Sequence, residues 1–298
     1  MIEETPEKGM MEYRNTAKIA FLAPKKKWSI YYKFLEYKKF IEEMTDISVD
    51  VFLGREVLKS HTDYDWIIGA VKRQRDYENE LFKQIRDRFI GLVTGYECRN
   101  RVTDWSIFKY LWFWADCYID DRFKDNTVFV EPFGVDHNLF KPLDTEKKFF
   151  ACFVGNDEWP KKRIKTFFIP LCHELGVNYY IVNGLKKWVA QEDLPLIYNM
   201  CDLYLSPSIY EAGPAPVLEA ASCGVPIVAC NSGFAPMFTC HAVITCESWN
   251  DYIQALETLK TDDKKRRVMG REARKEVLES WTWEKRIPSL LKKLEALN

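Results

Sequence analysis

The N-terminal part of the chain shows short apolar runs separated by charged stretches. Lys18–Ala23 and Trp66–Ala70 are compact apolar runs with β-branched and aromatic residues, a composition typical of buried strands. Ser29–Met44 carries apolar residues at helical spacing, whereas Ser48–Leu53 alternates between polar and apolar positions as a strand does. A strand, a helix and a second strand in this order predict a parallel sheet.

The same alternation continues up to a proline-glycine boundary. Further strands are expected at Ile90–Thr94 and Thr127–Val130, with a charged helix over Arg75–Arg88 and a buried aromatic helix over Trp105–Ala115. Pro132-Phe133-Gly134 follows the last of these strands and marks a natural boundary between two domains.

Beyond that boundary the pattern restarts and predicts a second α/β unit. The last expected helix contains Pro288, whose missing N–H should kink it. The expected strands are Phe149–Val154, Tyr179–Val182, Leu203–Ser206 and Val225–Ala229, and the expected helices are Ile164–Leu175, Leu194–Met200, Pro216–Cys223, Trp249–Lys260, Asp263–Glu279 and Trp283–Leu297. Two successive units of this kind predict a protein of the α/β class.

Composition narrows the classes of protein. A chain of 298 residues with 47% hydrophobic content can fill two cores, which excludes a disordered or fibrous protein. The formal net charge of −1 provides no global field to attract nucleic acid or an anionic membrane. Because no apolar run is long enough to span a membrane and the N-terminus is acidic, we expect a soluble, cytoplasmic protein with no transmembrane segment.

The residues that commonly bind metals do not form a recognisable site. The nine cysteines include no CxxC pair and predict reduced thiols, and the densest group matches no usual zinc spacing (Cys223, Cys230, Cys240, His241 and Cys246). Asp63-Tyr64-Asp65 matches the sequence of a metal-binding Asp-x-Asp motif. It precedes the expected strand Trp66–Ala70, however, and therefore lies at the wrong end of the sheet. No metal is expected.

The most informative stretch is Asp202–Ser232. An expected strand ends in Ser206-Pro207-Ser208, a loop rich in glycine and proline follows, and Pro216 stands where a helix should begin. The free N–H groups and the dipole of a helix N-terminus favour phosphate. Open parallel sheets bind ligands at the carboxyl ends of their strands, where this loop must lie. The stretch therefore predicts a phosphate site.

Two glutamates flank this loop. Glu211 stands at its start, and Glu219 follows eight positions later, about one turn into the helix. A carboxylate at each end of an amide-lined phosphate pocket suits a nucleotide sugar, with one carboxylate for the hexose and the other for the ribose.

The stretch resembles the signature of retaining glycosyltransferases of family 4, which have the GT-B fold. Glu211-Ala212-Gly213-Pro214 resembles the E-G-G-P variant of that signature, and 219–226 (EAASCGVP) matches the helix and Cys-Gly-x-Pro that follow. Secondary matches occur in the expected order at 132–136 with Phe140 and Pro142, at 153–155 with Lys161 and Lys162, at 197–208, and at 281–283.

The resemblance implies two Rossmann-like domains with parallel sheets facing across a cleft. The N-terminal domain, 1–132, would be a shortened acceptor domain, and 133–282 would bind the nucleotide sugar, with helix 283–298 packing back on the first domain. The family places an arginine for the diphosphate where this chain has Asn156, so the positive charge would come from Lys161, Lys162 or Arg163.

Two further departures concern the acceptor domain. Its first loop is 24–28 (PKKKW) in place of a glycine-rich turn. The family commonly has a donor-contacting histidine at the place of 93–97 (VTGYE), where this chain has none, so Tyr96 or Glu97 would substitute.

The implied reaction moves a sugar from a nucleotide diphosphate to a hydroxyl acceptor, a glycan or a lipid, with retention of configuration and without cofactor or metal. The implied catalytic residues are Glu211 and Lys162, and the implied donor-binding residues are Asn156, Lys161, Arg163, Gly213, Pro214, Ala215 and Glu219. Two alternatives stay open. One is a catalytically silent nucleotide-binding module; the other is transfer to a nucleic-acid base, prompted by Lys25–Lys27, Trp28, Arg99 and Arg101.

Overall fold

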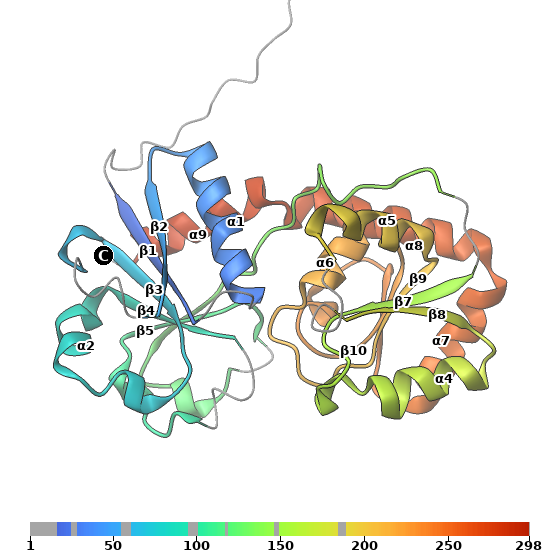
Figure 1. Ribbon diagram of the computed structural model, residues 1–298, viewed down its shortest axis with the longest axis horizontal. Coiled ribbons are helices and arrows are strands. Elements are labelled where there is room, and N and C mark those ends of the chain that lie inside the picture. The colour runs from blue at the N-terminus through green and yellow to red at the C-terminus, as the bar shows by residue number, and fades with distance from the viewer. Residues whose placement is uncertain are drawn as a thin grey trace, which may run out of the picture.

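The protein has two parallel β-sheets, each in its own α/β layer arrangement, set side by side (Figure 1). The computed structural model describes residues 17–24, 29–54, 61–94, 101–116, 119–145, 149–183 and 189–297. Tyr96, Glu97, Arg99 and the 25–28 segment, all named above as candidates, lie outside these ranges.

The first sheet has six parallel strands in the order β2-β1-β3-β4-β5-β6. Its middle strands are buried on both faces, as in other parallel sheets covered by helices. The strands are β1 (Lys18–Ala23), β2 (Ser48–Leu53), β3 (Trp66–Ala70), β4 (Phe89–Val93), β5 (Tyr110–Phe113) and β6 (Thr127–Val130), and the helices are α1 (Ser29–Met44) and α2 (Glu80–Ile85).

One helix prediction in this domain was wrong and another was too long. Within Trp105–Ala115 the structure has a short 3₁₀ turn and then strand β5, which pairs with β4 and β6. A strand buried on both faces reads as a continuous apolar run, so periodicity does not separate it from a buried helix. Within Arg75–Arg88 only α2 is α-helical, and 3₁₀ turns flank it.

The second sheet has five parallel strands in the order β11-β10-β9-β7-β8. Most of its elements match the prediction, but β11 had no counterpart there. The strands are β7 (Phe150–Val154), β8 (Asn178–Val182), β9 (Leu203–Ser206), β10 (Ile227–Cys230) and β11 (Val243–Cys246), and the helices are α4 (Ile169–Glu174), α5 (Leu194–Met200), α6 (Ala215–Ser222), α7 (Trp249–Thr261) and α8 (Asp263–Glu276).

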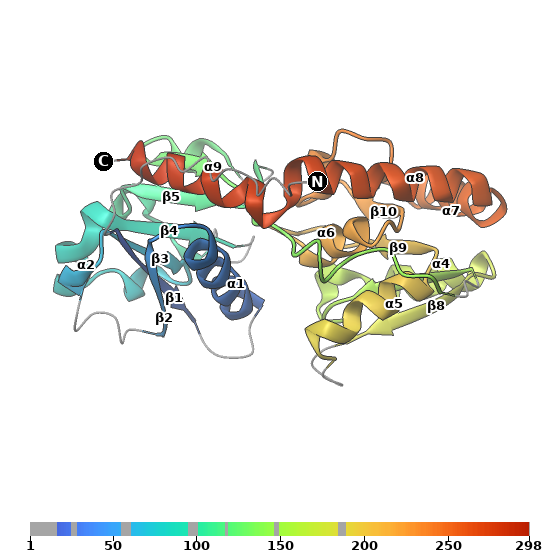
Figure 2. The same cartoon turned by 90° about the horizontal axis from the view of Figure 1, so that it is seen from above.

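The last helix, α9 (Trp283–Glu295), lies along the first domain, whereas α7 and α8 cover the second (Figure 2). Trp283 at its start stacks on Phe40 of α1 with ring centroids 5.4 Å apart. Ser289 and Lys293 both donate to the buried carboxylate of Glu131, each at 2.6 Å. The helix continues through Pro288 without a break in its helical assignment.

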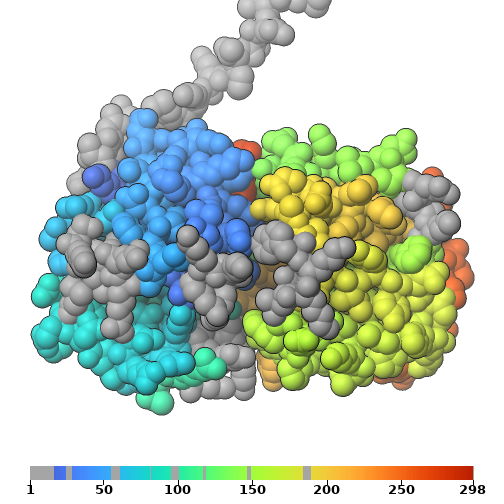
Figure 3. Space-filling model, viewed as in Figure 1, coloured from blue at the N-terminus to red at the C-terminus, as the bar shows by residue number. Residues whose placement is uncertain are grey.

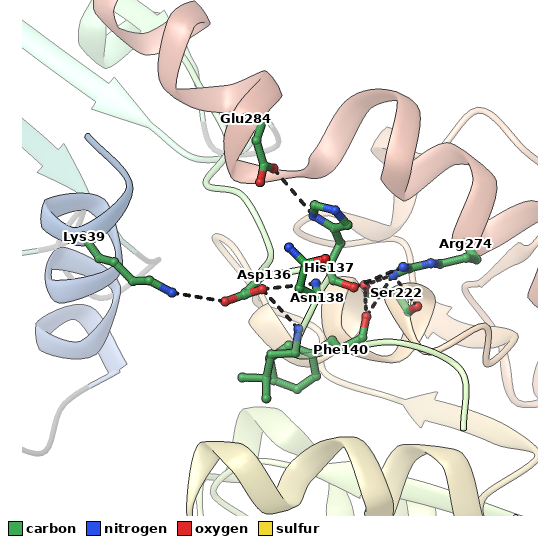
Figure 4. Close-up of polar contacts among 9 residues, drawn as sticks. Lys39, Asp136, His137, Asn138, Phe140, Ser222, Arg274 and Glu284 are labelled. Carbon is green, nitrogen blue, oxygen red and sulfur yellow. Dashed lines mark hydrogen bonds and ion pairs between the residues drawn. The ribbon is translucent and has the colours of Figure 1, made fainter. Parts of the chain in front are cut away.

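The linker between the sheets is fixed by one arginine (Figure 4). Arg274 of α8 donates to the carbonyl oxygens of Phe140 (2.8 Å) and His137 (3.0 Å) and to the hydroxyl of Ser222 (2.7 Å). Ser222 is the last residue of α6, and its hydroxyl in turn donates to the Phe140 carbonyl. The linker and α6 are therefore held in one position relative to each other.

Candidate active site

The order of the second sheet marks one position as the expected ligand site. Strand β7 has β8 on one side and β9 on the other, so the chain leaves the carboxyl ends of β7 and β9 in opposite directions. Ligands of open α/β sheets bind at such a switch point. The loops that leave there are 155–163 and 207–214, which contain most of the site residues expected from the sequence.

The loop after β7 begins with a turn at Asn156. Its side-chain oxygen accepts a hydrogen bond from the Glu158 amide at 3.0 Å, so this side chain caps the turn. Further along, the Lys161 ammonium lies 4.9 Å from the centre of the Trp159 ring, and the Lys161 carbonyl accepts from the amide of Ile209 at 3.2 Å. That bond ties the loop after β7 to the loop after β9.

Arg163 ends this loop in a strained backbone conformation. Its φ of 53° makes it the one non-glycine residue with positive φ in the described ranges, and an L-residue held there indicates a constrained position. The guanidinium lies 4.0 Å from the centre of the Phe167 ring. Its Nε is buried and makes no hydrogen bond within the described part of the chain.

An ion pair joins the two loops. The ammonium of Lys162, from the loop after β7, pairs with the carboxylate of Glu211, from the loop after β9. Both side chains are only 14% exposed. The backbone amide of Glu211 also donates to the hydroxyl of Ser232, at 2.8 Å, which fixes the residue from the β10 side. The sequence named Glu211 and Lys162 separately, and the structure brings them together.

The segment after Glu211 packs closely on aromatic rings. A Cβ built on Gly213 would lie 2.9 Å from Trp114 and Phe234 and 3.0 Å from Phe133, so only glycine fits. Trp114 follows β5 of the first domain, and therefore this loop touches both domains.

Helix α6 begins one residue before the predicted Pro216. Pro214 is the N-cap and Ala215 the first helical residue. Because Pro214 and Pro216 have no N–H, and the Val217 amide bonds back to the Pro214 carbonyl, the donors at this turn are the amides of Gly213 and Ala215.

Glu219 is buried, with 6% of its surface exposed. Its carboxylate accepts a 2.7 Å hydrogen bond from the hydroxyl of Tyr198 in α5. Burial raises the pKa of this carboxyl above its usual value, while the charge of Lys33 and the bond from Tyr198 lower it. Both Glu211 and Glu219 add to the raised pKa of the buried phenol of Tyr204, whose main cause is burial.

Sequence reasoning missed the residues that the first domain contributes. Lys33 of α1 is buried, pairs with Glu36 at 2.7 Å, and lies 4.8 Å from the centre of the Phe133 ring. Glu36 accepts a 2.8 Å hydrogen bond from Gln191 of the second domain. The surfaces of α1 and α5 lie against each other at this boundary (Figure 3). The sequence around Lys33 does not distinguish it from any other lysine of an amphipathic helix, so its position at the domain boundary could not be predicted.

The other candidate groups lie elsewhere. Asp65 accepts a hydrogen bond from the Lys18 amide at the amino end of β1, which confirms that the Asp-x-Asp sequence is at the wrong end of the sheet.

No group of three metal-binding side chains, and no helix long and apolar enough to cross a membrane, occurs in the ranges that the structure describes. Two cavities found there are lined by neither Glu211 nor Glu219.

Residues 184–276 match the family model described as Glycosyl transferases group 1. O-antigen chain mannosyltransferase B of Escherichia coli is 33% identical over 111 residues, which cover 28% of each chain. An α-1,3-galactosyltransferase of Escherichia coli, which by its name acts with UDP-galactose and α-D-GlcNAc-diphosphoundecaprenol, is 27% identical over 204 residues. That match covers 55% of this chain and 52% of the relative, so the chain spans about half the length of such relatives or less.

Solved structures show that the fold is GT-B. Sucrose-phosphate synthase from Thermosynechococcus elongatus has a TM-score of 0.66 at 13% identity, with 95% of this chain and all of that chain covered. HepE of Anabaena in complex with UDP-glucose has a TM-score of 0.67 at 15% identity, with 94% and 99% covered. The prediction of two Rossmann-like domains with parallel sheets is confirmed.

Proposed function

We propose that this protein is a glycosyltransferase that moves a sugar from a nucleotide diphosphate sugar to a hydroxyl acceptor. The observation that carries the proposal is the Lys162–Glu211 pair beside the Gly213 and Ala215 amides, at the switch point of a GT-B sheet. The match to Glycosyl transferases group 1, over residues 184–276, covers Glu211, Gly213 and Ala215 but not Lys162, and it supports this reaction class. The nucleotide sugars named for its relatives support the donor class.

In the proposed complex the diphosphate lies against the start of α6. The amides of Gly213 and Ala215 donate to it, and Lys162 and Arg163 supply the charge that Asn156 does not. Arg163 has a buried, unbonded Nε for this purpose. These cations take the role that a metal ion has in other sugar-transfer architectures, so the proposed reaction needs none.

We propose that Glu211 orients the sugar and that Glu219 accepts hydrogen bonds from the ribose hydroxyls. For Glu219 this requires the Tyr198 hydroxyl to share the carboxylate with the ribose. Transfer proceeds with retention of configuration. The acceptor oxygen bonds to the anomeric carbon on the face from which the diphosphate leaves, the bond from that carbon to the diphosphate oxygen breaks, and this oxygen takes the acceptor proton.

The test is the variant Glu211→Ala. We expect transfer to be abolished while the melting temperature and circular dichroism spectrum show an intact fold, because the carboxylate that orients the sugar is gone. Glu257→Ala, at an exposed site on α7, is the matched control and should retain activity. Unchanged turnover in Glu211→Ala would contradict the assignment.

The second candidate is a nucleotide-binding module without turnover. Asn156 favours it, because the side chain is neutral and already bonded within its own turn. Purified protein would be incubated with a panel of nucleotide diphosphate sugars, and binding and product formation would be measured separately. The second candidate would be favoured over the first if the protein bound a nucleotide diphosphate sugar but neither hydrolysed it nor transferred its sugar to any acceptor tested.

A further inference from the structure

The first domain has a basic cavity that the proposed donor site does not use. Its volume is about 730 Å³. Three arginines and a single carboxylate line it, although the chain as a whole carries a net charge of −1. The lining residues are Arg73, Gln74, Arg75, Glu78, Arg101 and Thr103.

Gln74 holds the two walls of this cavity together. Its side-chain oxygen accepts hydrogen bonds from the Thr103 amide (3.0 Å), the Thr103 hydroxyl (2.6 Å) and the Asp104 amide (3.1 Å). The segment after β3 is thereby fixed to the segment that precedes β5. Arg73 and Arg75 stand on one wall and Arg101 on the other, so the positive charges converge from two separate parts of the chain.

Two of these arginines have their donors available. The side chains of Arg73 and Arg75 are exposed and make no ion pair or hydrogen bond with the described residues. The one acidic group of the lining, Glu78, accepts a hydrogen bond from the Gln74 amide group instead. A planar guanidinium with free N–H groups binds phosphate oxygens in pairs, with better geometry than an ammonium.

One wall of the cavity begins just after the carboxyl end of β3. Arg73 follows the carboxyl end of β3, and Trp114, which contacts Gly213, follows the carboxyl end of β5. Strand β4 lies between them, with Val93 paired to Phe113. At about 4.8 Å between neighbouring strands, β3 and β5 are about 10 Å apart. Arg73 and Trp114 therefore both follow strand ends at the carboxyl edge of the first sheet, two strands apart.

We propose that this cavity binds a phosphate group carried by the acceptor. The inference rests on the proposed function and names the acceptor class: a phosphorylated sugar whose free hydroxyl reaches the donor while its phosphate is held by Arg73, Arg75 and Arg101. Arginines gathered around one open pocket suit a single phosphate or diphosphate. A nucleic-acid acceptor would be favoured by a track of cations along the surface.

The test compares a hexose 1-phosphate with the methyl glycoside of the same hexose as acceptors. Arg73→Gln and Arg101→Gln should each raise the KM for the phosphorylated acceptor about tenfold, and the double variant about a hundredfold. The KM for the methyl glycoside and the Kd for the donor should not change. Lys124→Gln, at an exposed lysine of the same domain, is the charge-matched control. Equal effects on both acceptors, or no effect on either, would overturn the proposal.

A binding experiment separates this proposal from the proposed reaction. The protein is saturated with UDP, which occupies the donor site, and hexose 1-phosphate is titrated by calorimetry. Binding that Arg73→Gln and Arg101→Gln remove, in a protein without transfer activity, supports the cavity and refutes the reaction. Absence of binding in a protein that does transfer sugar refutes the cavity alone.

The source of the phosphate is distinguished by a further comparison. The hexose 1-phosphate is tested against the same hexose joined through a diphosphate to a farnesyl chain in detergent. Sensitivity of both KM values to Arg73→Gln identifies the phosphate itself as the recognised group. If only single-stranded DNA binds, in a manner that weakens with salt and with Arg101→Gln, the phosphorylated-sugar proposal is wrong.

Discussion

The two ends of the donor loop differ in how their carboxylates are held. Glu211 is largely buried at the switch point and pairs with Lys162 of its own domain. Glu219 is buried in α6 and accepts a hydrogen bond from Tyr198, and the charge of Lys33 in the other domain opposes the rise that burial causes in the pKa of Glu219. The Lys162–Glu211 pair lies within one domain, whereas the effect of Lys33 on Glu219 acts across the two.

This difference suits the two glutamates to two tasks in the proposed reaction, the chemical step and the binding of the nucleotide. A pair within one domain keeps its geometry when the domains move, which suits the residues closest to the chemistry. The pKa of Glu219 depends in part on Lys33 of the other domain, so its protonation should depend on whether the two domains are together. Such a dependence suits the binding of the nucleotide. The comparison predicts that changes around Glu211 reduce kcat, and that changes around Glu219 affect the KM for the donor and its pH dependence.

The largest effect is expected from Lys162→Met. This variant removes the cation nearest Glu211, so the leaving diphosphate loses its stabilising charge, and kcat should fall about 100- to 1000-fold. Initial rates at saturating donor measure it, with Lys162→Arg expected to restore part of the rate. Lys165→Met, exposed in the same segment, is the control. A change confined to KM would assign Lys162 to binding instead.

A smaller effect is expected from Lys33→Met. In its proposed role Glu219 must be ionised to accept hydrogen bonds from both ribose hydroxyls, and the groups that change its pKa besides burial are Lys33, Tyr198 and Glu36. Loss of Lys33 raises the pKa of Glu219 further, so donor affinity should begin to fall at a higher pH, with KM up about tenfold near neutrality. The pH profile of donor Kd measures this. Lys39→Met on the same helix is the control, and an identical profile in both variants would remove Lys33 from the site.

The smallest effects concern stability, and they should have opposite signs. The folded state raises the pKa of Glu219, so this residue stabilises the fold below its unfolded pKa, and that stability is lost as pH rises through the folded value. Glu219→Gln should therefore raise the melting temperature at pH 7 by about 2 °C, with a difference that disappears in acid.

Glu211→Gln should lower the melting temperature by a similar amount, because Lys162 loses its partner in a largely buried pair. Thermal unfolding across pH measures both variants in parallel. Shifts of the same sign would show that the two carboxylates occupy equivalent environments. That result would contradict the difference between Glu211, which is ion-paired, and Glu219, whose pKa is raised by burial.

Local sequence patterns predicted the secondary structure correctly where the residues of an element themselves determine its conformation. Leu203–Ser206 and the helix at Pro216 were predicted from an apolar run and a proline near a helix start, and both are present as β9 and α6. The pattern failed at Trp105–Ala115, where aromatic residues on both faces of β5 resemble a buried helix. It also missed β11, a short strand that pairs only with β10 in the described sheet.

The sequence by itself determined the two α/β units, the loop between two glutamates and the turn at which its amides lie, because strand, turn and helix preferences act within a few neighbouring residues. Only the tertiary structure decided that Lys162 meets Glu211, that Trp114 packs on Gly213 and that the charge of Lys33 lowers the pKa of Glu219. Those interactions join residues distant along the chain, and their partners are selected by the order of the strands and the docking of two domains.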